Sequence, residues 1–423
     1  MGWVVGWETR PRSGPSSGGG CRGGGSRYPA GSAAQPLLPT PTVPPKVAIV
    51  GAGVAGCYLA QMLARNGVAV DLVDPQAPWS KPCGGGITAK AVAAFPLLAP
   101  LAEEAEGITR FRLIAPSGRE AELESRVPLW LLPRERLNAY LLEAAEACGA
   151  RRERHRVVHV VRREDGRWLL EAEHAGLGPY DHVVGADGAV STVRRALDRP
   201  FAREDLILAL DHHLGATGVE PHVAVAFFGR GMGYLWAFFA RDYASVGIGA
   251  PAHLHRRGEL EAKLRRFLAA RYPGLLEPKA QPVRWVIPYH RRGLLDRYRI
   301  QGDGWSLVGD AAGLADPLTG EGIYHALRSA RLLAEAFLLD QPGDYEAAVR
   351  RDLVPELEKG HAIARDYFRP WILELLVAAA RRSRALRDFL AEYLTGAAPY
   401  REARTRLRRR RRRILKELLG LRR

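Results

Sequence analysis

KVAIVGAGVAGCYLA, residues 46–60, is the stretch of this chain that decides its fold. An apolar run at 47–50, typical of a buried strand, leads directly into Gly51, Gly53 and Gly56 in GxGxxG spacing, and a helical pattern follows. The first glycine permits a tight turn, the second lets backbone N–H groups approach a pyrophosphate, and the third lets the helix pack closely on its strand. This pattern predicts a Rossmann-type unit that binds a dinucleotide at the helix N-terminus.

The second strand of the unit is predicted at VAVDLVD, and it ends in an acidic residue. Asp74 follows Gly56 at the distance where a carboxylate accepts hydrogen bonds from the ribose of the adenosine half. Asp71 lies inside the same strand and is the weaker candidate. A carboxylate at this place disfavours a nucleotide with a 2′-phosphate, because two anions would meet. A glycine-rich turn without a nucleotide is the alternative interpretation.

A second glycine-bearing segment, WSLVGDAAGLADPLTGEGI at 305–323, decides between NAD and FAD. Its first residues are predicted as a strand that delivers Asp310, whose carboxylate could bind the ribityl chain of a flavin. A helix is predicted over 318–330, with free N–H groups that face the flavin edge where negative charge develops on reduction. GDAAG by itself is a common strand-to-helix turn. Together with the first motif, it favours one FAD held from both ends.

Residues 46 to about 400 resemble the geranylgeranyl reductase family of FAD-dependent oxidoreductases, which share the para-hydroxybenzoate hydroxylase fold. The matches are the GxGxxG motif with its acidic residue, SKPCGGG at 80–86, GADGAVSTVRRAL at 185–197, and VGDAAGLADPLTGEGI at 308–323. A partial match to a YxWxFP stretch has Phe239 where proline is usual. The resemblance implies an α/β fold: a Rossmann-type FAD-binding domain with an inserted antiparallel-sheet substrate domain and a helical C-terminal region.

The same resemblance implies which residues contact the cofactor and the substrate. The expected FAD-binding residues are Gly51, Gly53, Ala55, Gly56, Asp74, Cys83, Gly84, Gly86, Arg134, Asp187, Asp310, Gly320, Gly322 and Ile323, and the expected substrate-pocket residues are Tyr234, Trp236 and Phe238. Cys83 could equally be a small buried hydrophobe, and Arg134 a solvated residue of a first helical turn. Asp187 is expected to support its turn first and the cofactor indirectly, and the aromatics could simply pack a core. No catalytic residue and no metal site is assigned.

The implied activity is hydride transfer from reduced FAD to a carbon–carbon double bond of a prenyl (geranylgeranyl-type) lipid, with NAD(P)H or a ferredoxin-like protein as electron donor. One alternative is an FAD-dependent monooxygenase, similar to aromatic hydroxylases, that uses NAD(P)H and oxygen. Another is a non-catalytic scaffold in which the flavin only stabilises the fold. A dehydrogenase that uses NAD alone leaves the segment 305–323 unexplained.

Length and patterning predict several parts in the 423 residues. They are a Gly/Pro/Ser-rich disordered tail at 1–45, an FAD-binding domain at 46–202 and 282–345, a substrate-binding sheet domain at 203–281, C-terminal helices at 346–400, and a basic amphipathic tail at 401–423. Alternating residues at 107–126 also suggest part of the antiparallel sheet. The cysteines show neither metal nor disulfide spacing, which predicts a reducing cytoplasm.

The basic charge is concentrated at the C-terminus. Of the formal net charge of +16, the last 23 residues account for +10 and the first 45 for +3, so residues 46–400 carry only +3. Six arginines at 408–413 precede a leucine-rich stretch, and a helix there would suit an anionic membrane surface. A solvated helix end is the alternative. A nucleic-acid arm is disfavoured, because no aromatic residue follows Tyr400 for base stacking. We therefore expect a cytoplasmic protein that can associate peripherally with a membrane.

Overall fold

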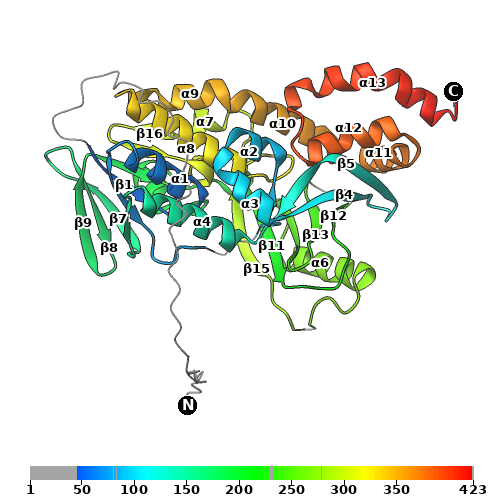
Figure 1. Cartoon of the computed structure of the whole chain (residues 1–423), viewed down its shortest axis with the longest axis horizontal. Helices are drawn as coiled ribbons and strands as arrows, with labels where there is room; N and C mark the ends of the chain where they lie inside the picture. The colour runs from blue at the N-terminus through cyan, green and yellow to red at the C-terminus, as the bar shows by residue number, and fades with distance from the viewer. Residues whose placement is uncertain (1–44, 80, 82, 229–231, 278, 422–423) are drawn as a thin grey trace, which may run out of the picture. The chain divides into compact units, whose positions relative to one another are not determined.

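A mainly parallel sheet carries the first glycine motif at the carboxyl end of its first strand (Figure 1). The computed structural model describes residues 45–421 except 80, 82, 229–231 and 278, so the tail expected at 1–45 lies, but for its last residue, outside the described residues. The sheet has the order β16-β17-β10-β1-β2-β6, with β1 (Lys46–Val50), β2 (Ala69–Val73), β6 (Arg151–Glu153), β10 (His182–Gly185), β16 (Gln301–Gly302) and β17 (Trp305–Leu307). Only the β16–β17 pair of these strands is antiparallel.

Helices and a small antiparallel sheet surround this parallel sheet. The helices are α1 (Val54–Ala64), α4 (Arg134–Ala147), α5 (Thr192–Leu197), α7 (Leu294–Arg297) and α8 (Ile323–Leu338), and the small sheet is β7 (Val157–Arg162), β8 (Trp168–Ala172) and β9 (Ala175–Tyr180). α1 packs against α4 and α8. Because β1 is buried from Val47 onward, its run of apolar residues forms the centre of the core beneath the motif.

A second, larger sheet stands beside the first. Its order is β15-β11-β14-β13-β12-β4-β5-β3, with β3 (Gly86–Ile87), β4 (Glu106–Ile114), β5 (Glu120–Leu131), β11 (Leu206–Leu214), β12 (His222–Phe227), β13 (Tyr234–Phe239), β14 (Ala244–Pro251) and β15 (Val283–Pro288). All pairings are antiparallel except β12 with β4. The predicted Rossmann-type domain, inserted sheet and helical C-terminal region are therefore confirmed.

The boundaries of the second sheet differ from those expected. β3, β4 and β5 lie within 46–202, and β15 lies within 282–345, yet all four strands pair in the second sheet. The chain therefore enters this sheet twice, because backbone pairing joins segments that are far apart in sequence. The alternation at 107–126 indicated this arrangement, and β4 and β5 carry it.

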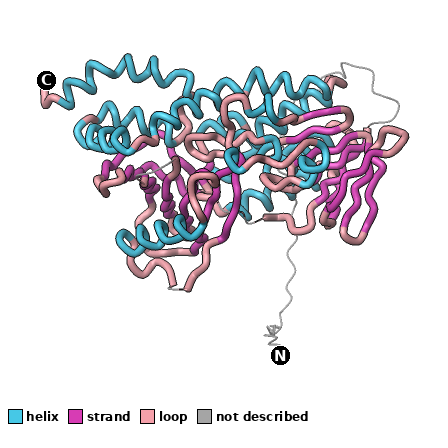
Figure 2. Tube along the Cα trace, turned by 180° about the vertical axis from the view of Figure 1, so that it is seen from behind, coloured by secondary structure: helices cyan, strands magenta, loops and turns pink. Residues whose placement is uncertain are grey.

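Different helices pack on the two faces of the second sheet (Figure 2). α6 (Arg257–Arg271) packs on one face through Leu260, Leu264 and Leu268. The other face is covered by the C-terminal helices α10 (Val354–Tyr367), α11 (Pro370–Arg382), α12 (Arg384–Leu394) and α13 (Ala403–Leu418), which follow α9 (Tyr345–Asp352). The short helices α2 (Ala89–Ala94) and α3 (Ala99–Glu104) and the 3-10 turns η1 (Pro96–Leu98), η2 (Arg203–Asp205), η3 (Gly309–Ala312), η4 (Pro342–Asp344) and η5 (Tyr400–Glu402) connect these layers.

Candidate active site

One cavity of about 1010 Å³ joins the two sheets, and both glycine-bearing segments line it. The expected site residues in its wall are Gly51, Gly53, Ala55, Asp74, Cys83, Gly84, Gly86, Arg134, Asp187, Tyr234, Trp236, Phe238, Asp310, Gly320, Gly322 and Ile323. Gly56 is absent from this wall. The fold thus brings residues that lie up to about 270 positions apart in the sequence together around a single cavity.

The three glycines of the first motif do three different things. Gly51 has a φ of +103°, and a Cβ there would lie 2.6 Å from the Ala186 carbonyl carbon. A Cβ at Gly56 would lie 1.9 Å from the Gly51 carbonyl oxygen, so this glycine permits close packing of helix and turn and does not face the cavity. At Gly53 a Cβ would meet no atom within 4 Å. Open space of the cavity therefore lies beside Gly53, where α1 starts with neither a side-chain cap nor an acidic residue in its first turn.

Asp74, at the end of β2, and Asp71, within β2, have different surroundings. Asp74 lines the cavity, and its carboxylate accepts hydrogen bonds from the backbone N–H of Ala52 at 2.8 Å and from Trp79 Nε1 at 2.7 Å. Asp71 instead accepts from Arg151 at 2.8 and 2.9 Å and from Tyr180 at 2.8 Å, away from the cavity. Burial opposes the ionisation of Asp71, but these hydrogen bonds outweigh it and lower the pKa of its carboxyl. Asp71 is thus part of the sheet's own structure.

The second motif enters its helix later than the sequence predicts. α8 begins at Ile323, so the expectation of a helix from residue 318 is wrong. Asp316 Oδ1 accepts hydrogen bonds from the N–H groups of Leu318 and Thr319 at 2.8 and 2.9 Å, and Gly320 has a φ of +70°. These side-chain contacts hold a turn that competes with the helix. The glycine-rich turn, and not a helical turn, therefore forms the cavity wall here.

A half-buried ion pair stands beside this turn, and the sequence did not single it out. Glu321 accepts from Lys90 Nζ at 2.5 Å and from Thr88 Oγ1 at 2.6 Å. Burial disfavours the charge on Glu321, but the Lys90 ammonium outweighs it and lowers the pKa of this carboxyl. A similar pair joins Asp310 to Lys81, and all four charged residues line the cavity. No sequence signal links these lysines to their partners, because the pairs form only between distant segments.

Cys83 is held by a polar network from the second sheet. Its backbone N–H donates to Asp211 Oδ2 at 2.9 Å, and its carbonyl accepts from the Tyr243 hydroxyl at 3.1 Å. The fully buried Asp211 also accepts from Ser245, which in turn accepts from Trp236 Nε1, each at 2.8 Å. Sequence reasoning missed Asp211, which lies in the middle of an otherwise ordinary strand. Its contacts fix the backbone at Cys83, whose thiol forms no disulfide with another described cysteine.

The aromatic residues of β13 alternate between the two faces of the sheet. Tyr234, Trp236 and Phe238 line the cavity, whereas Phe239 is fully buried on the opposite face, 4.9 Å from the Tyr272 ring. A Cβ at Gly84 would lie 2.4 Å from the Phe238 ring, so only glycine fits there. The departure from the YxWxFP pattern at Phe239 therefore lies outside the cavity wall.

Buried polar atoms in the wall fit a bound FAD. Arg134 Nε and Asp187 Oδ1 are buried without a hydrogen-bond partner in the described part of the chain. Burial raises the pKa of Asp187, whose other oxygen accepts from the Thr192 N–H at 2.6 Å at the start of α5. Unsatisfied buried groups are costly, so such atoms in a cavity wall indicate a polar ligand. With the uncapped α1 terminus and open Gly53, they suit a dinucleotide.

Comparisons with known proteins agree with this geometry. The FAD binding domain family matches residues 45–344. A chloroplastic geranylgeranyl diphosphate reductase from Arabidopsis thaliana is 28% identical over 376 residues, covering 82% of this chain and 76% of that protein. A menaquinone reductase from Mycolicibacterium smegmatis is 30% identical over 346 residues, covering 75% and 82%.

A solved structure shares the fold. A geranylgeranyl bacteriochlorophyll reductase-like protein from Thermoplasma acidophilum superimposes with a TM-score of 0.68 at 22% identity, covering 86% of this chain and 98% of that one. The chain therefore belongs to the FAD binding domain family and is an FAD-dependent oxidoreductase related to the geranylgeranyl reductases.

Proposed function

We propose that this enzyme reduces carbon–carbon double bonds in the isoprenoid chain of a prenyl lipid. One observation carries the proposal: the cavity that begins at the first glycine motif continues into an apolar arm between the second sheet and the C-terminal helices. The wall of this arm includes Phe111, Leu113, Val223, Val225, Phe227, Phe368, Leu376 and Leu390. A long apolar chain suits such a space, because its burial is the main favourable term in binding.

The names of the relatives support the same substrate class. Geranylgeranyl diphosphate and menaquinone, named for the plant and mycobacterial relatives, both carry isoprenoid chains. The two molecules differ in their polar ends, and isoprenoid character is what they share. We therefore propose that the enzyme recognises the isoprenoid chain of its substrate, and we assign no headgroup.

Residues of this chain would hold the cofactor from both ends. Asp74 would accept the ribose hydroxyls of the adenosine half, the α1 N-terminus would face the pyrophosphate, and Asp310 would bind the ribityl chain. The turn at Gly320 and Gly322 would stand at the flavin edge. When bound, FAD supplies the hydride for the alkene, with electrons from NAD(P)H or a ferredoxin-like donor.

The wall of the second sheet would align the alkene and exclude water. The Tyr234 hydroxyl donates to the Thr319 carbonyl, which ties this wall to the turn of the second motif. Phe238 packs over Gly84 and Trp236 is held by Ser245, so both aromatic side chains have fixed positions. An isolated alkene accepts hydride slowly, so alignment in a dry pocket must contribute much of the acceleration.

An anaerobic half-reaction tests the proposed function. The flavin of the holoenzyme is reduced with one equivalent of dithionite and then mixed with geranylgeranyl diphosphate. We expect the oxidised flavin spectrum to return and the product to gain two hydrogen atoms, because the substrate takes up both electrons. Flavin that stays reduced with geranylgeranyl diphosphate and with menaquinone would contradict the proposal. Reoxidation only with oxygen and an aromatic compound, with one oxygen atom gained, would indicate a monooxygenase, and bound flavin that no donor reduces would indicate a scaffold.

We expect Leu376→Trp to change chain-length preference. Leu376 is half-buried on α11 and lines the apolar arm, so a larger side chain would shorten it. The expected result is a roughly tenfold lower kcat/KM for geranylgeranyl diphosphate, equivalent to about 1.4 kcal/mol. The kcat/KM for geranyl diphosphate should stay within about twofold of the wild type.

The adjacent residue gives a matched control. Leu375 is 63% exposed on the outer side of the same helix, so Leu375→Trp in detergent should leave both substrates unaffected. Equal losses for short and long substrates in Leu376→Trp would argue against an arm that holds the chain.

A further inference from the structure

α13 is firmly attached to the body of the protein along its inner face. Ile414 is buried in the apolar core that the C-terminal helices share with the second sheet, and Glu392 of α12 accepts from Arg406 at 3.3 Å and from Arg410 at 2.6 Å. Glu417 accepts from the Ser383 hydroxyl at 2.7 Å. The helix is thus a packed element of the fold, and its outer face has a defined direction.

The outer face of α13 is first cationic and then apolar. Arg404, Arg408, Arg411 and Arg412 are exposed and form no ion pair with any described residue. Leu415 and Leu419 follow at helical spacing and are 58% and 63% exposed. The structure thus places exposed leucines beyond the exposed arginines on the same outer side of the helix.

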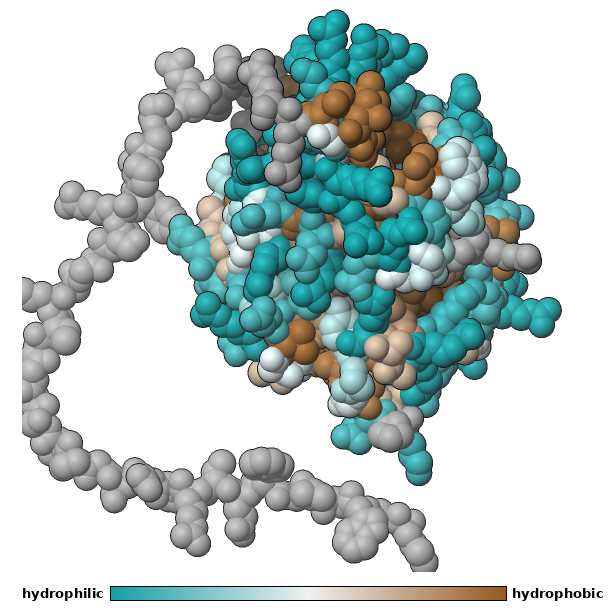
Figure 3. Space-filling view, turned by 90° about the vertical axis from the view of Figure 1, so that its right-hand side faces the viewer, coloured by the Kyte–Doolittle hydropathy of each residue, from teal (hydrophilic) through white to brown (hydrophobic). Residues whose placement is uncertain are grey.

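α11, which contacts α13, carries a second exposed apolar group. Trp371 and Leu375 are each 63% exposed, one helical turn apart, and Arg381 and Arg382 at the end of this helix are also exposed. α11, α12 and α13 contact one another. Figure 3 looks onto the side of the molecule that bears these helices, and hydrophobic side chains gather there next to strongly hydrophilic ones.

The exposed arginines and the exposed apolar residues of these helices together indicate which kind of partner binds there. Exposed leucines would have no role on the phosphate backbone of a nucleic acid, and two copies of this arginine-rich face would repel each other. No helix of the described residues is long and apolar enough to cross a bilayer. Arginines that meet anionic headgroups while leucines and a tryptophan enter the acyl boundary are the pattern of an interfacial helix.

We propose that α11 and α13 dock this enzyme on the surface of an anionic phospholipid bilayer. The cavity reaches the surface close to this face, because Ala397 and Arg401, directly before α13, are exposed and line it. A lipid substrate could then move from the bilayer into the apolar arm without crossing water. This last step rests on the proposed function, whereas docking itself does not.

Co-sedimentation of the holoenzyme with vesicles tests the docking, followed by the flavin absorbance of the pellet. Vesicles of phosphatidylcholine with phosphatidylglycerol should bind at least about tenfold more tightly than pure phosphatidylcholine, and added salt should weaken this binding. The combined variant Arg408→Glu, Arg411→Glu, Arg412→Glu should bind the anionic vesicles at least about tenfold more weakly. Leu415→Ser with Leu419→Ser should also weaken binding but keep its salt dependence.

A matched charge reversal on another helix is the control. Arg256, Arg257 and Arg266 are exposed at and on α6, on the opposite side of the second sheet (Figure 1), and their replacement by glutamate should leave vesicle binding intact. Equal losses in this control and in the α13 variant would overturn the proposal, as would binding to DNA or self-association without vesicle binding. Vesicle binding by a wild-type enzyme that reduces no prenyl substrate would reject the proposed function and leave the docking surface standing.

Discussion

A Gly53→Val protein should fold normally and fail to retain FAD, with affinity at least about 100-fold weaker, or about 2.7 kcal/mol. Gly53 has φ −80° and ψ −169°, which valine adopts readily, and no protein atom lies within 4 Å of the position of a Cβ. The valine side chain would therefore cause no clash within the protein and would occupy the space beside the α1 N-terminus. Flavin absorbance relative to protein absorbance after purification, and calorimetric titration of the apoprotein with FAD, measure the loss.

Two other glycines make this prediction specific. Gly176 on β9 also has open space around its Cβ position and lies outside the cavity wall, so Gly176→Val should keep its FAD. Gly56→Val should fail to fold, because its Cβ would overlap the Gly51 carbonyl. A Gly53→Val protein that copurifies with a full equivalent of FAD would show that the cofactor binds elsewhere.

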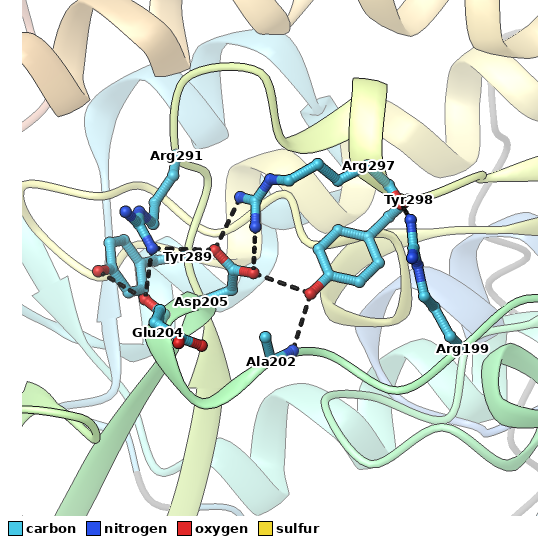
Figure 4. Close-up of polar contacts among 8 residues, drawn as sticks. All are labelled: Arg199, Ala202, Glu204, Asp205, Tyr289, Arg291, Arg297 and Tyr298. Atoms are coloured by element: carbon cyan, nitrogen blue, oxygen red, sulfur yellow. Dashed lines mark hydrogen bonds and ion pairs between the residues drawn. The ribbon is translucent and has the colours of Figure 1, made fainter.

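Replacement of Asp205 by asparagine should lower the stability of the protein by about 2 kcal/mol, since a buried charge pair loses one partner. Figure 4 shows the fully buried Asp205 carboxylate between Arg297, at 2.8 and 2.9 Å, and the Tyr298 hydroxyl, at 2.8 Å. The Ala202 N–H donates to the same hydroxyl at 2.8 Å. These contacts join the segment that leaves for β11 to the segment that returns from β15, and so they fix the second sheet against the parallel sheet. The Arg297 side chain is partly exposed, which is why we expect a smaller loss than the roughly 3–5 kcal/mol typical of a fully buried pair.

The effect of Asp205 should depend on pH. Burial would raise the pKa of this carboxyl, but the hydrogen bonds from Arg297 and Tyr298 outweigh burial and lower it. A carboxyl with a lowered pKa stabilises the fold above its ordinary pKa of about 4, and this contribution is lost as the pH falls through the folded-state pKa. The wild type should therefore lose its advantage over Asp205→Asn in acid.

Thermal unfolding measures the Asp205 prediction, with an expected decrease of about 3 °C in the midpoint at neutral pH. Asp165 is the control, because it also accepts from arginines but is exposed in the turn between β7 and β8. Asp165→Asn should change the midpoint by less than about 1 °C. Equal effects at the two positions would mean that the buried cluster does not join the sheets.

The features that could be predicted from the sequence are the local ones. The turn at Gly51 and the strand and helix on either side were predictable, because glycine spacing and apolar runs act over a few residues. The later start of α8 was not, since Asp316 and its side-chain contacts compete with a helix only in that particular turn. The pairing of β5 with β4, and of β4 with β12, was only suggested by alternation, because alternation defines a face and not a neighbour.

The sequence by itself determined the cofactor family, the first βαβ unit and the acidic residue at the end of its second strand. Only the tertiary structure decided which aromatic residues face the cavity, that Asp211 holds the backbone of Cys83, and that Lys90 pairs with Glu321. It also decided that exposed leucines share the outer side of α13 with arginines. The physical reason is range: dihedral preference and periodicity are written within a few residues, whereas burial and charge pairing arise between segments that meet only when the chain folds.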